Sequence, residues 1–232
     1  CVNIGFDAIE IHMAHGYLLH QFLSPLSNKR EDHYGISFKG RMQFPLDLFE
    51  AIKKEIPKNF PLGVRISASD WVSDSSWDID EATIFSQELE KIGCSFLDIS
   101  SGGNSPAQNI DPGPGYQTEF SAKIRNSTNI PIIAVGQISD ARQAETIIRS
   151  KQADMVALAR AMLYNPRWPW HAAEILSQEC PYPPQYARAH QSLIGLPIPG
   201  NPPHLKQKPL KTTTQFEAIL PSMRTLYPNL LT

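Results

Sequence analysis

Short apolar runs recur along most of the chain and alternate with longer segments of helical periodicity. The runs predict five strands, over residues 8–12, 62–67, 96–100, 130–135 and 155–158. The intervening segments predict helices over about residues 38–56, 80–92 and 168–178, another from Ser139 or Asp140 to about Ser150, and a short one opening at Ala159 and Arg160. Strand, loop and helix in repetition indicate parallel βα units.

About five such units fit this pattern, whereas a closed (β/α)8 barrel needs eight. An open doubly wound sheet is the structural alternative, although that fold usually shows an early Gly-rich phosphate loop, which this sequence lacks. Gly5 is typical of a helix end, so we expect the chain to begin inside a domain. From about residue 191 the sequence is rich in Pro and Lys, which predicts an extended tail over 191–232 in which residues 216–226 could form a short helix.

The composition changes this picture little. Among 232 residues, 41% are hydrophobic and 19% are charged, and the net charge is −2. This balance is typical of a globular domain and indicates neither a nucleic-acid nor a membrane partner. The three cysteines, Cys1, Cys94 and Cys180, are widely separated, which favours neither a disulfide framework nor a metal site. We therefore expect a cytoplasmic protein without a bound metal.

The strongest candidate chemistry lies at the end of the first predicted strand. His12, His15 and Tyr17 follow an alternating apolar run, so a buried strand would deliver two imidazoles and a phenol to its C-terminal end. Two neutral imidazoles can donate hydrogen bonds to one carbonyl oxygen, and a phenol beside them can supply a proton. The alternatives are a core histidine with a surface histidine, or a zinc pair, for which no third ligand stands at a convincing spacing.

Polar residues also end the other predicted strands. Arg65 ends an otherwise apolar strand, where it would either form an ion pair with Glu10 or Asp98 or lie beside a cofactor that becomes negative. Gly136 and Arg160 follow the last two strands, the place where (β/α) barrels often bind phosphate; the alternative is a tight turn and a helix-capping arginine. The segment 100–103, which contains Ser101 and Gly102, is either a flexible loop or a smooth wall against a flat ligand.

The segment that holds the two histidines resembles the signature of the Old Yellow Enzyme family, the FMN-dependent NAD(P)H:flavin oxidoreductases or ene-reductases. Its His-x-x-His form is similar to the bacterial-type, thermostable-like branch. The resemblance covers about residues 1–190, through the segments 10–35, 63–67, 98–103, 134–136, 153–160, 165–170 and 184–188. It implies a (β/α)8 TIM barrel of which this chain supplies about the last five βα units, over residues 1–190. The family usually has Gly-Gly where this chain has Gly35-Ile36.

The resemblance implies an enzyme that uses NAD(P)H and FMN to reduce the C=C bond of an α,β-unsaturated carbonyl compound, an enone or enal. His12 and His15 would hold the substrate carbonyl oxygen, and Tyr17 would protonate the alkene carbon next to the carbonyl. Arg188 resembles an arginine that this branch inserts into a neighbouring subunit's active site, which implies a homodimer or larger oligomer if the fold is complete.

The resemblance also implies how FMN is bound. Arg65 would face the N1/O2 edge of the flavin, and the phosphate would lie against Gly136, Ala159 and Arg160. Because the first three βα units of the family's barrel are not found in this sequence, a truncated, catalytically inactive relative that does not retain flavin is a second hypothesis. A phosphate-binding barrel aldolase or isomerase is a third, but no strand-end lysine is placed to form a Schiff base.

Overall fold

The computed structural model describes residues 1–73, 76–180 and 182–188. It divides into a unit of Cys1–Gln178 and a second unit that begins at Glu179 and contains the short 3-10 helix η2 (Pro184–Tyr186). The expected boundary at residue 190 and the tail over 191–232, with its short helix at 216–226, lie outside the described residues.

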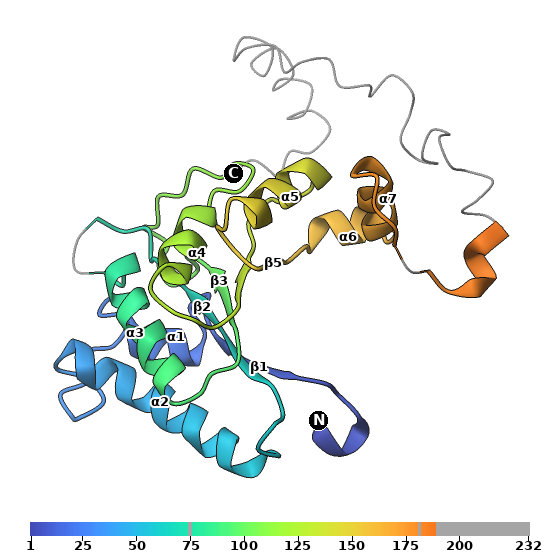
Figure 1. Cartoon of the computed structure of the whole chain (residues 1–232). Coiled ribbons are helices and arrows are strands. Elements are labelled where there is room, and N and C mark those ends of the chain that lie inside the picture. Colours follow the sequence, from blue (N-terminus) through green and yellow to red (C-terminus); the bar gives the residue numbers. More distant parts are fainter. Residues whose placement is uncertain (74–75, 181, 189–232) are drawn as a thin grey trace, which may run out of the picture. The chain divides into compact units, whose positions relative to one another are not determined.

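The first unit is built on a sheet of five parallel strands in the order β1-β2-β3-β4-β5 (Figure 1). The strands are β1 (Ile9–Met13), β2 (Leu62–Ser67), β3 (Leu97–Ser100), β4 (Ile132–Ala134) and β5 (Met155–Val156). In a doubly wound sheet the strand order reverses at a switch point, whereas here each strand pairs with the next one in sequence. The fold is therefore a run of consecutive βα units, as expected for part of a (β/α) barrel, and the doubly wound alternative is wrong.

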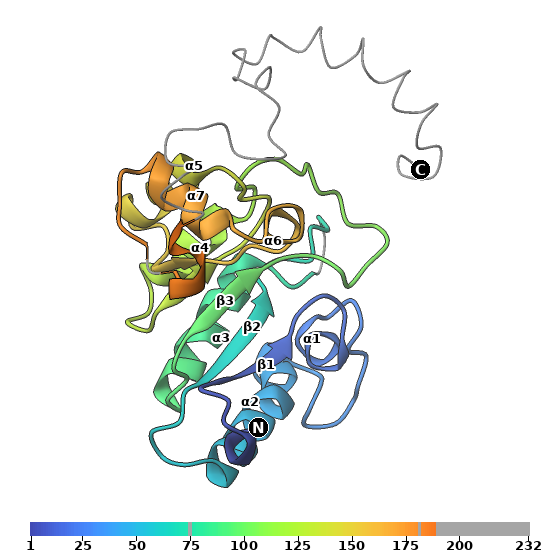
Figure 2. The same ribbon diagram turned by 90° about the vertical axis from the view of Figure 1, so that its right-hand side faces the viewer.

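Helices follow each strand, and α2, α3, α4 and α5 pack their apolar residues against one face of the sheet (Figures 1 and 2). They are α1 (Leu18–Leu23), α2 (Phe38–Glu55), α3 (Ile79–Lys91), α4 (Thr118–Arg125), α5 (Ala141–Arg149), α6 (Arg160–Tyr164) and α7 (Trp168–Ile175), after a 3-10 helix η1 (Val2–Ile4). The side chain of Asp78 accepts hydrogen bonds from the first amides of α3, and Asp140 does the same for α5. Asp78 and Asp140 are thus the N-caps, and of the two residues expected to begin the helix up to Ser150 it is Asp140 that caps it.

Most of the expected elements are present, and the fourth and fifth strands are shorter than expected. Gly5 does end a helix, in the left-handed conformation with φ 87°, although that helix is only η1. Helices α1 and α4 were not expected. Helix α1 has six residues, too few to display a helical period, and α4 follows a segment rich in Gly and Pro that predicts a loop.

The two faces of the sheet differ in chemistry. The face toward the helices is apolar, and its side chains form one core with residues of α2, α3, α4 and α5, including Phe49, Phe85 and Ile124. The opposite face, here called the polar face, carries Glu10, His12, Arg65 and Asp98. The strand register places His12 beside Arg65 and Arg65 beside Asp98 in one cross-strand row. Because the two faces alternate along each strand, the apolar packing on one side fixes which polar groups point to the other.

Candidate functional site

Three candidate side chains come together in the turn between β1 and α1. The rings of His12 and His15 have centroids 5.2 Å apart, and those of His12 and Tyr17 are 5.3 Å apart. His12 is the last but one residue of β1, His15 lies in the turn, and Tyr17 is the N-cap of α1. The strand and the helix together thus gather two imidazoles and a phenol at one point, as expected from the sequence.

The turn is held against the ends of the two neighbouring strands. The His15 amide donates to Ser67 Oγ at 3.0 Å, and its ring Nε2 lies 2.7 Å from Ser100 Oγ. Ser67 ends β2 and Ser100 ends β3. A Cβ atom on Gly103 would lie 2.6 Å from the Cα of His15, so only a glycine allows this approach.

Both imidazoles are electrically neutral at neutral pH. Burial, with further contributions from the charges of Arg65, His12 and His20, lowers the pKa of His15 to about 4. Burial and the Arg65 charge also lower the pKa of His12. A neutral imidazole has one N–H donor and one acceptor nitrogen. His12 can therefore donate one hydrogen bond to a ligand oxygen without carrying a charge. His15 can do so from Nδ1 in the tautomer whose Nε2 accepts from Ser100 Oγ.

Arg65 lies next to this group and forms an ion pair with Asp98, Nε to Oδ2 at 3.4 Å. The sequence predicts either an ion pair or a cofactor contact for Arg65. The structure contains the ion pair with Asp98, and a cofactor contact by the same side chain stays a prediction. The side chain of Arg65 is 28% exposed, and its buried Nε makes no hydrogen bond within the described ranges. Burial raises the pKa of Asp98 to about 6, although Arg65 opposes this shift and Glu10 adds to it.

A cavity of about 400 Å³ opens at the same end of the sheet, a size typical of small-ligand sites. Arg65 and Ser100 line it from β2 and β3, and Gly136, Ala159 and Arg160 line it from the segments that follow β4 and β5. Since Ser100 also contacts the His15 ring, the cavity and the histidine turn share a wall.

Gly136 closes one side of this cavity. Its φ is 133°, and a Cβ atom there would lie 2.9 Å from Gln117 Nε2 and 3.2 Å from Tyr116. Only a glycine therefore fits against Gln117 and Tyr116 here, and it leaves the backbone of the cavity wall without a side chain at this point. Arg160 is exposed at the start of α6 and also lines the cavity. The cavity wall therefore combines the backbone at Gly136 with two positive charges, those of Arg160 and Arg65.

The remaining expected residues lie elsewhere. Ser101 is buried and donates its hydroxyl hydrogen bond to Gln117, and the Gly102 carbonyl accepts from Ser67 Oγ at 2.9 Å. Both support the wall between the turn and the cavity without being among the cavity's lining residues. Arg188 is exposed in the second unit.

Sequence reasoning missed several residues of this region. Gln117, buried in the Gly- and Pro-rich stretch before α4, lines the cavity and donates to the Val135 carbonyl at 2.9 Å. His20 and Asp70 form a fully buried pair beneath the turn. Nothing in the local sequence pattern marks any of the three, because each acquires its partner only when distant segments pack together.

No group of three or more His, Cys, Asp or Glu side chains is placed to hold a metal ion in the residues that the structure covers. None of the helices over those same residues is long and apolar enough to cross a membrane.

Comparisons with known proteins agree with the geometry. Residues 1–179 match the family described as NADH:flavin oxidoreductase / NADH oxidase. The chain is 42% identical over 185 residues to the NADPH dehydrogenase of Clostridium acetobutylicum, covering 80% of this chain and 54% of that protein. It is 42% identical over 184 residues to the NADPH dehydrogenase of Bacillus subtilis, covering 79% of this chain and 53% of that protein. The chain thus spans about half the length of the curated relatives it matches.

Solved structures show the same fold. A 2-naphthoyl-CoA reductase complex superposes with a TM-score of 0.69 at 21% identity, covering 76% of this chain and 27% of that chain. Morphinone reductase superposes with a TM-score of 0.61 at 25% identity, covering 79% of this chain and 48% of that one. These likenesses confirm the expectation of a partial TIM barrel.

Proposed function

Because the chain belongs to the NADH:flavin oxidoreductase / NADH oxidase family, the Old Yellow Enzyme family expected from its sequence, we propose that it forms the FMN-binding part of an NAD(P)H-dependent ene-reductase. The substrate would be a small α,β-unsaturated carbonyl compound, an enone or enal. The observation that carries this proposal is the shared wall between the histidine turn and the cavity, where Ser100 lines the cavity and contacts His15.

The cavity residues fit FMN. A phosphate needs a cation and close backbone, which Arg160 and Gly136 provide, with Ala159 between β5 and α6. A flavin that accepts electrons needs a cation near its pyrimidine edge, and Arg65 has a buried Nε that makes no hydrogen bond in the described part of the chain. Ser101 and Gly102 would complete the wall behind the ring. When bound, FMN supplies the hydride that it has received from NAD(P)H.

The chain's own residues would then bind the substrate and move a proton. His12 and His15, both neutral, donate hydrogen bonds to the carbonyl oxygen and stabilise negative charge as it develops there; losing one such donor commonly raises a barrier by about 3 kcal/mol. Tyr17 is 64% exposed, and its hydroxyl delivers a proton to the alkene carbon next to the carbonyl. Arg188 would reach the site of a neighbouring subunit in a homo-oligomer.

One observation favours a second candidate, an inactive remnant that does not retain flavin. Glu10 and His12 on the polar face are exposed. A site whose opposite wall is open to water would bind a flat ligand weakly.

Flavin titration of the purified chain separates the two candidates. We expect FMN to bind with quenching of its fluorescence, and to bind more tightly than riboflavin, which lacks the phosphate. Arg160→Ala should abolish this preference for FMN and leave riboflavin affinity unchanged. Arg149→Ala is the matched control, because Arg149 is 79% exposed on α5 and pairs only with Glu145 in the described contacts. Absence of FMN binding would support the remnant.

A further inference from the structure

The turn that carries His15 and Tyr17 has an unfavourable backbone conformation. His15 has φ 58° and Gly16 has φ 72°, so two successive residues lie in the left-handed region. A residue with a side chain rarely adopts this conformation, and it persists only where neighbouring groups hold it. The turn must therefore be fixed by contacts outside its own sequence.

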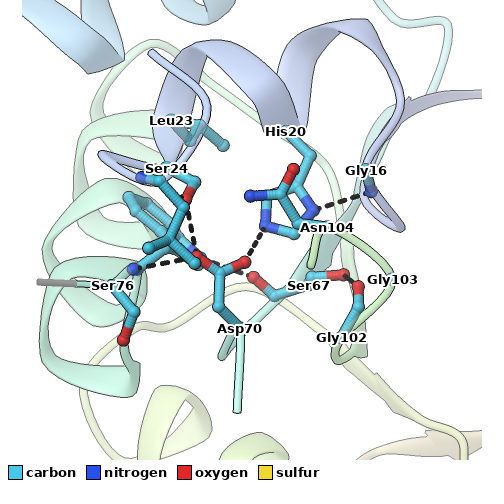
Figure 3. Close-up of polar contacts among 12 residues, drawn as sticks. Gly16, His20, Leu23, Ser24, Ser67, Asp70, Ser76, Gly102, Gly103 and Asn104 are labelled. Carbon is cyan, nitrogen blue, oxygen red and sulfur yellow. Dashed lines mark hydrogen bonds and ion pairs between the residues drawn. The ribbon is translucent and has the colours of Figure 1, made fainter. Parts of the chain in front are cut away.

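His20, on the first turn of α1, provides one of these contacts. Its side chain is fully buried, and its Nδ1 accepts the backbone N–H of Gly16 at 2.9 Å (Figure 3). Because Nδ1 is the acceptor, the ring carries its proton on Nε2. Nε2 lies 3.1 Å from Asp70 Oδ1, within ion-pair distance, and neither of these two buried atoms makes a hydrogen bond with any described residue. Asp70 Oδ1 is thus the polar atom that faces this ring nitrogen.

Asp70 is itself held in one orientation. Its second oxygen, Oδ2, accepts from Ser24 Oγ at 2.6 Å and from the Trp77 amide at 3.0 Å. Burial alone would raise the pKa of Asp70, but the neighbouring His20 ring and the hydrogen bond from Ser24 outweigh it and lower the pKa. The carboxylate therefore stays ionised and cannot rotate away from His20.

The same buried cluster reaches the other side of the turn. Trp77 Nε1 donates to the Ser67 carbonyl at 2.6 Å, and Ser67 Oγ accepts the His15 amide at 3.0 Å. The backbone amide of His15 is thus bound by Ser67 of β2, and the backbone amide of Gly16 is bound by His20 of α1.

The residue types Ser24, Asp70 and His20 are those of a hydrolytic triad, but their arrangement is different. Ser24 donates to the carboxylate rather than to the imidazole, and all three residues have 0% exposure. The second ring nitrogen of His20 faces a backbone amide. A nucleophile needs its base beside it and access to substrate, so this cluster does not act on a substrate directly.

We propose that His20 and Asp70 are a positioning pair: Asp70 fixes the tautomer of His20, and His20 fixes the Gly16 amide, which sets where His15 and Tyr17 stand relative to the cavity. Neither residue touches substrate or cofactor. The consequence for catalysis rests on the proposed function, whereas the control of the turn does not.

The test measures the turn itself, by hydrogen exchange of the Gly16 amide and by NMR of the His20 ring nitrogens in the full chain. We expect His20→Leu and Asp70→Asn to speed Gly16 exchange at least tenfold, and Asp70→Asn to populate the tautomer protonated on Nδ1. His20→Asn places an amide oxygen where Nδ1 stood, so it should restore much of the protection of the Gly16 amide from exchange. If His20→Leu does not fold, the Gly16 exchange rate in His20→Asn and Asp70→Asn tests the proposal.

Asp154→Asn is the matched control. Asp154 accepts from Arg125 and from the Ile132 amide, so its loss should destabilise the fold without changing Gly16 exchange relative to the rest of the sheet. Unchanged Gly16 exchange in folded His20→Leu or Asp70→Asn, or an equal increase in Asp154→Asn, would overturn the proposal.

Binding of 4-nitrophenol to the FMN-loaded chain, followed by its own absorbance, connects the pair to the site. We expect Asp70→Asn to weaken binding at least tenfold and Asp154→Asn to leave it unchanged. If the unmodified chain bound no 4-nitrophenol while Gly16 exchange still responded as expected, the proposed function would fail and the positioning pair would stand. If Asp70→Asn sped Gly16 exchange but left 4-nitrophenol affinity intact, the link from the pair to the site would be wrong.

Discussion

Arg65 on β2 and Asp98 on β3 are register partners, and their charged groups lie 3.4 Å apart on the polar face of the sheet. Asp98 is 4% exposed, so its carboxylate depends on Arg65 for compensation of its charge. The same arginine lines the cavity. The Arg65 guanidinium therefore both pairs with Asp98 and lines the candidate ligand site. Mutation can separate these two roles.

Arg65→Met should destabilise the chain by about 2 kcal/mol at pH 7, because it leaves a buried carboxylate without its cation. The loss should shrink at pH 5, since Asp98 has a pKa of about 6 with Arg65 present and takes up a proton still more readily without it. Urea denaturation at the two pH values measures both effects. The double variant Arg65→Met with Asp98→Asn should recover at least half of the loss. Additive effects of the two single changes would show that the pair is not coupled.

Gly103→Ala should cost about 3 kcal/mol of stability. Its φ is 89°, and the new Cβ would lie 2.6 Å from the Cα of His15, so backbone strain and a steric clash add together. Gly5→Ala is the control, because Gly5 has nearly the same φ of 87° with no atom within 4 Å. It should cost only about 1 kcal/mol, the strain alone. Equal losses in denaturation midpoints would mean that Gly103 does not pack against the histidine turn as described.

Ile36→Gly should stabilise the chain by about 0.5–1 kcal/mol. Ile36 has φ 54° and is 79% exposed, so the isoleucine is strained and buries little in return. Relief of the strain outweighs the greater freedom of glycine in the unfolded chain. Ile4→Gly, at a position 76% exposed within η1, should have no stabilising effect. A lower thermal midpoint for Ile36→Gly would contradict the explanation.

The strands could be predicted from sequence because the apolar face of the sheet is continuous. Ile11, Val64, Ile99 and Ile132 all belong to one buried core, and each stands in an apolar run that is visible without the structure. The expected ends were less accurate. Val135 and Leu158 continue the apolar runs past β4 and β5, but the chain leaves the sheet there to form the cavity wall.

The candidate site could be predicted only in part. His12, His15 and Tyr17 are close in sequence, so the end of one strand brings them together. In the sequence, His20 and Asp70 are separated by helix α2 and strand β2. Neither residue stands in a pattern that distinguishes it from an ordinary polar residue. Their partnership arises when the loop after β2 folds beneath α1, a long-range contact that local periodicity does not encode.

His15 should make stability depend on pH. Its pKa in the folded chain is about 4, below the usual 6.5, so the unfolded chain binds a proton between these values while the folded chain does not. The linkage relation then requires stability to fall as the pH drops from 7 to 5. After discounting for the partly exposed ring, this residue should contribute about 1 kcal/mol of the loss.

Urea unfolding of His15→Gln at pH 7 and pH 5 should show a loss of stability that is smaller by this amount, and His12 should account for part of the loss that remains. His33→Gln, which removes an exposed histidine outside the turn, is the control. An unchanged dependence in His15→Gln would show that folding does not lower the pKa of His15, which would contradict the burial described for its ring.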